Sequence, residues 1–361
     1  MISIAAPTIS ADAQERVRDV LESGMIADGE TVRTFEAEFA SLCETSHGVA
    51  TSNGTTAIEA TLRGFGIGEG DTVLTTPFSF VATANAIRLA GAEPVFADID
   101  PETYTLDPDA AREVANETDV DAILTVHLYG LPSEMDDLVD LAEDLDVPLI
   151  EDAAQAHGAA SDGRRVGSIG DAACFSFYPT KNMTTGEGGM VTTDREDVSE
   201  RIRSFINHGR QAGGGGYEHA ALGTNYRMTN VAAAIGLSQL ERLPDFTERR
   251  RTNADRLTAG LRDVPGVTPP VEPDGMRHVY HQYTVRTADR DALASHLEAE
   301  GVGSGIYYPT AIHEQPAYDH VTHSAPVAER AAAEVLSLPV HPGVDDADVD
   351  HILEVIEDYA A

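Results

Sequence analysis

Short apolar runs alternate with helical patterns along the first part of this 361-residue chain. Strand-like runs are predicted at residues 71–75, 93–99, 122–126, 148–150, 172–177 and 189–193, with helices at 79–90 and 135–145. Such alternation is typical of a parallel sheet whose strands are joined by right-handed crossovers and covered by helices. The sequence therefore predicts an α/β fold, in which ligands bind at the carboxyl ends of the strands.

The pattern changes after a long arginine-rich helix predicted at residues 228–261. Beyond it we expect an α+β module with a strand at 282–286 and helices at 290–300 and 346–359. The proline-rich stretch 264–273 is a candidate boundary loop, and the glycine run 213–216 is expected to be a flexible loop.

The charge balance excludes several classes of partner. The chain has 61 acidic and 24 basic side chains, which gives a formal net charge of −37. A surface this acidic repels phosphate backbones and anionic membranes, so no nucleic-acid or membrane partner is expected. Self-repulsion on this scale is tolerable in concentrated salt, where screening is short-ranged. We therefore interpret the acidity as adaptation to a salt-rich, halophilic cytoplasm.

Cysteine content and segment hydropathy bear on location. Cys43 and Cys174 are the only cysteines, too few for a disulfide framework or a zinc knuckle, and no metal site is expected. The first ten residues do not resemble a signal peptide, and no apolar run approaches the roughly 20 residues of a membrane span. These features predict a soluble, cytoplasmic protein.

Lysine is almost absent. The 24 basic residues are 23 arginines and one lysine, Lys181. Arginine can replace a lysine that only supplies charge, but it stays protonated and cannot act as an amine nucleophile. Lys181 is therefore a candidate chemical group, although a single surface lysine could also have survived by chance.

Two further candidates follow predicted strands. Asp152 comes just past the strand at 148–150, where a helix cap is the common role and a partner for a protonated pyridine nitrogen is another. Ser176, at the end of the strand that precedes Lys181, offers a hydroxyl, unless it is a core serine bonded to backbone.

Two turns add groups to the same edge. Residues 51–57 form a small-residue turn before a helical segment, which is an ordinary helix cap or a phosphate site. Phe80 follows a Thr-Pro-Phe-Ser turn and is either a packing residue or a ring that stacks on a planar cofactor. Together, phosphate donors, an aromatic face, a carboxylate and an amine fit pyridoxal 5′-phosphate.

The order of these segments resembles the DegT/DnrJ/EryC1/StrS family of sugar aminotransferases, which has the fold-type I, aspartate aminotransferase-like fold. The resemblance runs through nearly the whole chain. The matching segments are Ser52-Asn53-Gly54-Thr55, residues 76–83, 126–130, 151–158, 175–182, 186–189 and 223–228, Tyr307-Tyr308-Pro309 with His313, and Ser337-Leu338-Pro339.

The resemblance implies a role for each matching residue. Lys181 forms the imine with pyridoxal 5′-phosphate and then acts as acid and base. Asp152 pairs with the pyridine nitrogen, Gln155 lies against the ring or its 3-oxygen, and Phe80 stacks on the other face. The phosphate is held by Gly54, Thr55 and Ser176, and by Asn225 of the neighbouring subunit of a homodimer with shared active sites. The nucleotide sugar is contacted by Tyr307, Tyr308, His313 and Arg227, each of which could instead be a packing residue.

The resemblance also implies an architecture: a large cofactor-binding domain, residues 1–245, with a mainly parallel seven-stranded sheet in an α/β/α sandwich, and a smaller α+β domain, residues 246–361. Relatives with histidine in place of the lysine perform a dehydration. Because Lys181 is present here, transamination is the expected chemistry.

The expected reaction moves an amino group from an amino acid to a keto group of a nucleotide-linked sugar, for amino-sugar and glycan biosynthesis. L-glutamate is the expected amino donor. Residues 225–230 and 233–236 resemble enzymes of 4-keto sugars, whereas 280–286 are similar to relatives that act on 3-keto sugars. We favour C4 over C3. Two alternatives stay open: a regulator that binds pyridoxal 5′-phosphate without turnover, and a fold-type I lyase or aldolase acting on amino acids.

Overall fold

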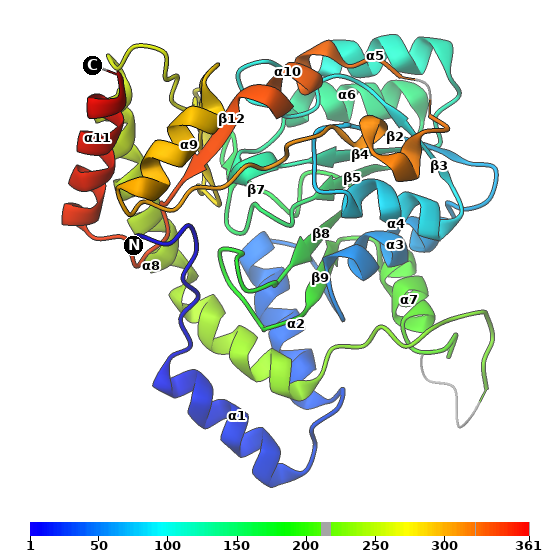
Figure 1. The fold of residues 1–361 in the computed structure, drawn as a ribbon. Coiled ribbons are helices and arrows are strands. Elements are labelled where there is room, and N and C mark those ends of the chain that lie inside the picture. Colours follow the sequence, from blue (N-terminus) through cyan, green and yellow to red (C-terminus); the bar gives the residue numbers. More distant parts are fainter. Residues whose placement is uncertain (211–217, 322, 361) are drawn as a thin grey trace.

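A seven-stranded sheet lies at the centre of the molecule (Figure 1). The structure is a computed structural model that describes residues 1–210, 218–321 and 323–360. Its strands are β1 (His47–Thr51), β2 (Thr72–Thr75), β3 (Glu93–Phe96), β4 (Ala122–Val126), β5 (Leu149–Asp152), β8 (Ala172–Ser176) and β9 (Gly189–Thr193). Their order is β1-β9-β8-β5-β4-β2-β3, and β9 runs antiparallel to both of its neighbours. The other pairs are parallel, so the predicted α/β fold with a mainly parallel seven-stranded sheet is confirmed.

Helices cover both faces of this sheet. They are α2 (Glu30–Cys43), α3 (Gly54–Phe65), α4 (Ala82–Ala90), α5 (Pro108–Glu117), α6 (Met135–Leu145), α7 (Glu196–Phe205) and the start of α8 (Asn230–Leu261). Helix α1 (Ala11–Ser23) packs against α8 instead. Apolar residues of α3, α4 and α7 pack on one face. On the other face α5 and α6 cover one half of the sheet, and α2 with the start of α8 covers the other. The result is a three-layer sandwich that fixes the carboxyl ends of the strands.

A second module follows helix α8 (Asn230–Leu261). Strands β11 (Tyr283–Arg286) and β12 (Val335–Leu338) form an antiparallel pair beside α9 (Arg290–Ala299), α10 (Pro326–Glu334) and α11 (Asp346–Ala360). Short turns of 3₁₀ helix lie at Leu128–Gly130, Ile312–Glu314 and Pro316–Tyr318, and β6 (Ala160–Ser161), β7 (Arg164–Arg165) and β10 (Met276–Arg277) make a small separate sheet. Helix α8 runs without interruption through position 245, where the two expected domains would meet.

Both ends of the chain lie in this second module (Figure 1). Ile2 pairs with Val302 in a parallel bridge, and the Ile2 amide donates to the Gly301 carbonyl at 2.8 Å. Ile2 also packs on the apolar core that α9, α11, β11 and β12 share. The first residues of the chain therefore belong structurally with its last third, although sequence position alone assigns them to the first domain.

Several predicted boundaries are corrected. The helix predicted from residue 79 begins at Ala82, because residues 76–81 form the turn after β2, and the strand predicted to residue 99 ends at Phe96. The long helix begins at Asn230 instead of 228, since the Thr229 hydroxyl caps it by accepting from the Ala232 amide. Asp152 is the last residue of β5 and not the residue after it. The predicted glycine loop 213–216 lies outside the described residues.

Two elements, β1 and α2, were not predicted, for different reasons. Strand β1 contains Gly48 and Ala50, which are poor strand formers. Helix α2 has a readable signal, since Val32, Phe35, Phe39 and Cys43 recur at helical spacing and are all buried.

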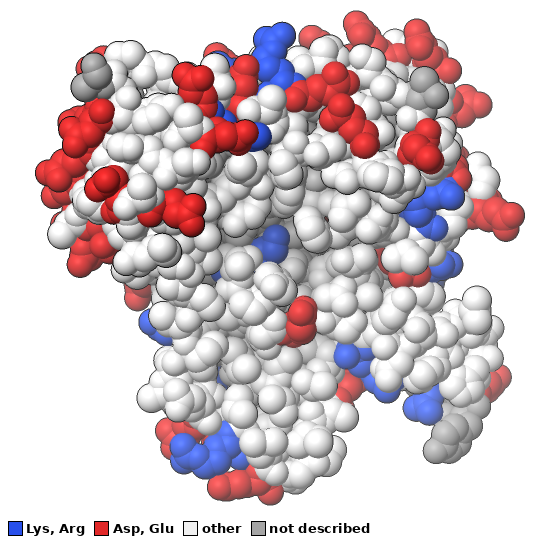
Figure 2. Space-filling view, in the orientation of Figure 1, with Lys and Arg blue, Asp and Glu red and all other residues white. Residues whose placement is uncertain are grey.

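The remaining predictions concern cysteines, metals and membranes. Cys43 and Cys174 are both buried and unpaired, as expected. Among the described residues, no helix is long and apolar enough to cross a membrane, and no group of three or more His, Cys, Asp or Glu side chains is arranged to hold a metal ion. Acidic side chains are scattered around the rim of the face in Figure 2, whose hollowed middle is mostly uncharged.

Candidate active site

A cavity of about 780 Å³ opens at the carboxyl edge of the sheet. This volume is in the range of small-molecule binding pockets. The cavity brings together most of the residues that the sequence singled out: Gly54, Thr55, Phe80, Asp152, Gln155, Ser176, Lys181, Tyr307 and Tyr308. They come from the ends of β1, β2, β5 and β8 and from the second module, so the fold assembles groups that are far apart in sequence.

Lys181 lies in the loop between β8 and β9. Its backbone amide donates to the Tyr178 carbonyl at 2.9 Å, which closes a tight turn. The side chain reaches into the cavity, and burial lowers the pKa of its amine to about 8, while the nearby Asp152 carboxylate opposes that shift. A lysine with this pKa has a substantial neutral fraction near neutral pH, as an amine nucleophile requires.

Asp152 is buried at the end of β5 and held by two donors. The Thr83 hydroxyl donates to Oδ2 at 2.8 Å, and the Ala154 amide donates to Oδ1 at 3.2 Å. The Thr83 hydroxyl has one hydrogen, which it donates to Asp152. In the 2.8 Å hydrogen bond between the Ser79 and Thr83 hydroxyls, Ser79 is therefore the donor. Burial raises the pKa of Asp152, and this effect outweighs the two hydrogen bonds, which lower it. A cation bound beside this carboxylate would relieve the cost of burying its charge.

The start of helix α3 presents its amides to the cavity. Asn53 caps the helix: its Oδ1 accepts from the Thr56 amide at 2.9 Å, and its own amide donates to the Thr56 hydroxyl at 3.2 Å. A Cβ on Gly54 would stand 2.8 Å from the Ser176 Cβ, so only glycine allows β8 to approach this closely. Backbone amides, a helix N-terminus and the Ser176 hydroxyl together suit an anion such as phosphate.

Gln155 and two rings form another part of the wall. The Gln155 Oε1 accepts from the Tyr129 amide at 2.8 Å, and its Nε2 donates to the Tyr308 hydroxyl at 3.3 Å. The rings of Phe80 and Tyr308 lie 5.8 Å apart, and Phe80 is 53% exposed at the mouth of the cavity. Phe80 therefore has a free face that a planar ligand can cover.

The profile of the DegT/DnrJ/EryC1/StrS aminotransferase family matches residues 7–357. The chain belongs to this family. It is 38% identical to a Streptomyces venezuelae dTDP-3-amino-3,4,6-trideoxy-alpha-D-glucose transaminase, over 99% of this chain and 95% of that protein. It is 36% identical to a Caulobacter vibrioides GDP-perosamine synthase, over 99% and 97%. The crystal structure of S. venezuelae DesV superposes with a TM-score of 0.93 at 37% identity, covering 98% of this chain and 99% of DesV.

Membership of the family makes the chain an aminotransferase, as the resemblance implied. The resemblance also named three residues that do not line the cavity. Asn225 is exposed, and Arg227 donates from Nη1 to the Asn207 Oδ1 at 2.7 Å. His313 is buried between Phe96 and His323, with its Nε2 3.1 Å from a Glu329 oxygen. The roles expected of these three residues therefore need a second subunit or a rearrangement.

Thr83, Glu187, His281 and Gln282 are among the lining residues that were not predicted as site residues. Thr83 and Glu187 lie inside segments that match the family. Thr83 is in the first turn of α4, and its hydroxyl lies 2.8 Å from that of Ser79 in the turn before the helix. His281 and Gln282 lie in the segment 280–286, whose likeness to relatives was noted without assigning either residue a role.

Proposed function

We propose that this aminotransferase moves an amino group from L-glutamate to a keto group of a nucleotide-linked sugar, with pyridoxal 5′-phosphate bound at Lys181. The observation that carries the proposal is the position of the chain's single lysine. It is buried in one cavity with Asp152 and the capped start of α3. Two relatives whose names specify sugar amination, at 36% and 38% identity over nearly the whole chain, support the sugar as acceptor.

The residues of the cavity fit the cofactor. Gly54 and Thr55, with the Ser176 hydroxyl, would hold its phosphate where the lack of a side chain at position 54 lets Ser176 approach the start of α3. Asp152 would pair with the pyridine nitrogen, and this pairing would offset the cost of burying the carboxylate. Gln155 and Phe80 would lie against the ring. The bound cofactor supplies an electron sink for the substrate's Cα.

Lys181 carries the proton in this proposal. Burial lowers the pKa of its amine to about 8, so a larger fraction of the free amine is neutral and able to accept a proton than in an exposed lysine. It would take a proton from the donor's Cα and return one to the cofactor's reactive carbon. The acceptor half-reaction uses the same amine in the reverse sense.

We further propose that two chains form a homodimer with shared active sites. The lining of the cavity, within the part of the chain that the structure describes, includes Lys181 but no arginine, whereas a nucleotide sugar carries a diphosphate. Asn225 and Arg227 of the partner subunit would supply a phosphate contact and a cation.

Half-reaction spectroscopy tests the proposal. Glutamate alone should convert the bound cofactor to its amine form, and a keto sugar nucleotide should restore the starting spectrum. We propose C4 as the aminated position because of residues 225–236, although the name of the S. venezuelae relative specifies a 3-amino sugar. A panel of 4-keto and 3-keto nucleotide sugars, with the products read by NMR, decides between them. No spectral response to glutamate would indicate a non-catalytic regulator, and product formation from an amino acid alone would indicate a lyase.

Location and salt response complete the proposal. We place the enzyme in a salt-rich cytoplasm, where its two buried thiols stay reduced and its net charge of −37 is screened. Activity and stability that rise with salt concentration would support this location.

A further inference from the structure

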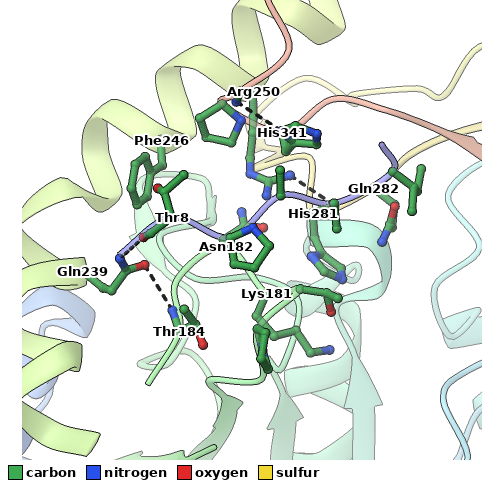
Figure 3. Close-up of a pocket in the computed structure, with 18 residues that line it drawn as sticks. Thr8, Lys181, Asn182, Thr184, Gln239, Phe246, Arg250, His281, Gln282 and His341 are labelled. Carbon is green, nitrogen blue, oxygen red and sulfur yellow. Dashed lines mark hydrogen bonds between the residues drawn. The ribbon is translucent and has the colours of Figure 1, made fainter. Parts of the chain in front are cut away.

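A second, much smaller cavity meets the first at Lys181. It measures about 50 Å³, enough for about one or two water molecules. Its walls come from the N-terminal segment 4–8, helix α8 and the Lys181 loop (Figure 3). Four residues line both cavities: Thr180, Lys181, His281 and Gln282. Lys181 and His281 thus stand together at the junction of the two cavities.

The backbone around His281 is fixed from two sides. Arg250 of α8 donates from Nη1 to the carbonyls of Tyr280 and His281, at 3.0 and 3.2 Å. The Gln282 amide donates to the Tyr129 carbonyl at 3.2 Å. A Cβ on Gly130 would stand 2.9 Å from the backbone nitrogen of His281, so this segment packs directly against the turn after β4. The imidazole therefore projects from a rigid support, and in Figure 3 it lies between Arg250 and Lys181.

The imidazole is buried and its Nδ1 has no hydrogen-bond partner in the structure. His281 is 7% exposed. The titratable and charged groups around it are Lys181 in its loop, Arg250 on α8, His157 after β5, and His278 on its own segment, and all of them oppose a positive charge on the ring. Burial and these neighbours hold the pKa of His281 well below its ordinary value. A neutral imidazole has one nitrogen that accepts a hydrogen bond. Lys181 is one of two charged donors among its electrostatic neighbours, and it lines both cavities with His281.

We propose that His281 is a positioning residue for Lys181, with a neutral imidazole nitrogen that accepts a hydrogen bond from the Lys181 amine and holds it at the junction of the two cavities. The hydrogen bond forms when the Lys181 amine is not bonded to the cofactor, and it favours the protonated amine over the neutral one. It supports the proton that Lys181 carries while the substrate reacts, and it directs the amine back toward the cofactor pocket. This inference rests on the proposed function only in taking Lys181 as the reacting amine.

The single lysine makes a direct test possible. We would grow the full-length chain on ¹³C-labelled lysine, remove any cofactor, and follow the one lysine side-chain resonance through a pH titration. The wild type should titrate near pH 8. His281→Phe should lower the pKa of Lys181 by about one pH unit, since a hydrogen bond to a charged group is lost. Asn and Gln each keep an acceptor, so His281→Asn or His281→Gln should restore the wild-type value.

A matched control separates this contact from general packing. His157 is also buried and electrostatically coupled to Lys181, but it packs among Phe39, Phe175 and Phe177 and lines neither cavity. His157→Phe should leave the titration of Lys181 unchanged. If His281→Phe does not fold, His281→Leu takes its place.

The proposal is overturned if the apolar variants titrate like the wild type, if both amide variants behave like His281→Phe, or if His157→Phe gives the same shift. No sugar nucleotide enters this experiment. Failure of the sugar specificity would therefore leave its outcome intact, and failure here would leave the half-reaction result intact.

Discussion

The two walls of the active-site cavity have different origins. One wall is the edge of the central sheet, where Gly54, Asp152, Ser176 and Lys181 follow or end strands. The other wall comes from the second module, which contributes His281 and Gln282 from one segment and Tyr307 and Tyr308 from another. The sheet wall is set by topology, whereas the second wall depends on how two modules pack.

This difference indicates a division of chemical labour. The sheet wall contains the amine, the buried carboxylate and the anion cradle, which are the groups that a shared cofactor needs. The second wall presents rings and an amide whose positions depend on contacts such as the hydrogen bond between Gln155 and Tyr308. We therefore expect changes in the sheet wall, and at His281 if it positions Lys181, to affect all substrates alike. Changes at Tyr307 and Tyr308 in the second wall should affect the choice of substrate.

The largest expected effect follows substitution of Lys181. Lys181→Arg keeps a positive charge but has no free amine, so turnover should fall by about 10⁴-fold or more. The absorbance of cofactor linked to the lysine should vanish as well. Borohydride reduction of the wild-type holoenzyme should label one side chain, Lys181, and label found at another residue would contradict its assignment.

Asp152→Asn should have the next largest effect. Asparagine keeps the shape and still accepts from the Thr83 hydroxyl, but it removes the charge that would pair with a pyridinium. We expect kcat to fall by about 10²-fold or more for every acceptor, because electrostatic support of the reacting group is lost. Thr83→Val, which removes one hydrogen bond and leaves the carboxylate, serves as the control and should cost about ten-fold or less. Equal losses in the two variants would show that orientation outweighs charge.

Gly54→Ala should weaken cofactor binding without altering the chemistry. The added methyl group would meet Ser176 at 2.8 Å and push β8 away from the start of α3. We expect the cofactor's Kd to rise by about ten-fold, equivalent to about 1.4 kcal/mol, which lies within the about 1–3 kcal/mol that overpacking costs. Gly68→Ala is a matched control, since its nearest neighbour would be the Ala90 carbonyl at 3.6 Å. Cofactor titration by fluorescence compares the two, and a similar loss in both would exclude the cradle as the cause.

The same contrast explains what the sequence could predict. Strand β4 and strand β9 begin and end where their patterns indicate, and the order of parallel strands then brings Asp152, Ser176 and Lys181 to one edge. His281 was inaccessible to such reasoning, because its place beside Lys181 depends on Arg250 and on Gly130, which lie far from it in sequence. Asn225 does not line this cavity, and its proposed role is in the site of the partner subunit, which the order of strands within one chain does not specify.

His313 gives the smallest expected effect and the sharpest test of the boundary between the walls. The resemblance assigned it to the sugar, yet it is buried against Phe96 and Glu329 outside the cavity. His313→Gln should leave KM for the sugar within about two-fold and lower Tm by about 2 °C, because the ring that packs between Phe96 and His323 is lost. Tyr308→Phe is the matched change inside the cavity: it removes the hydroxyl that accepts from Gln155, and should raise KM by a few-fold. If His313→Gln raises KM more than Tyr308→Phe does, the second wall extends to the segment at 312–314 when the sugar binds.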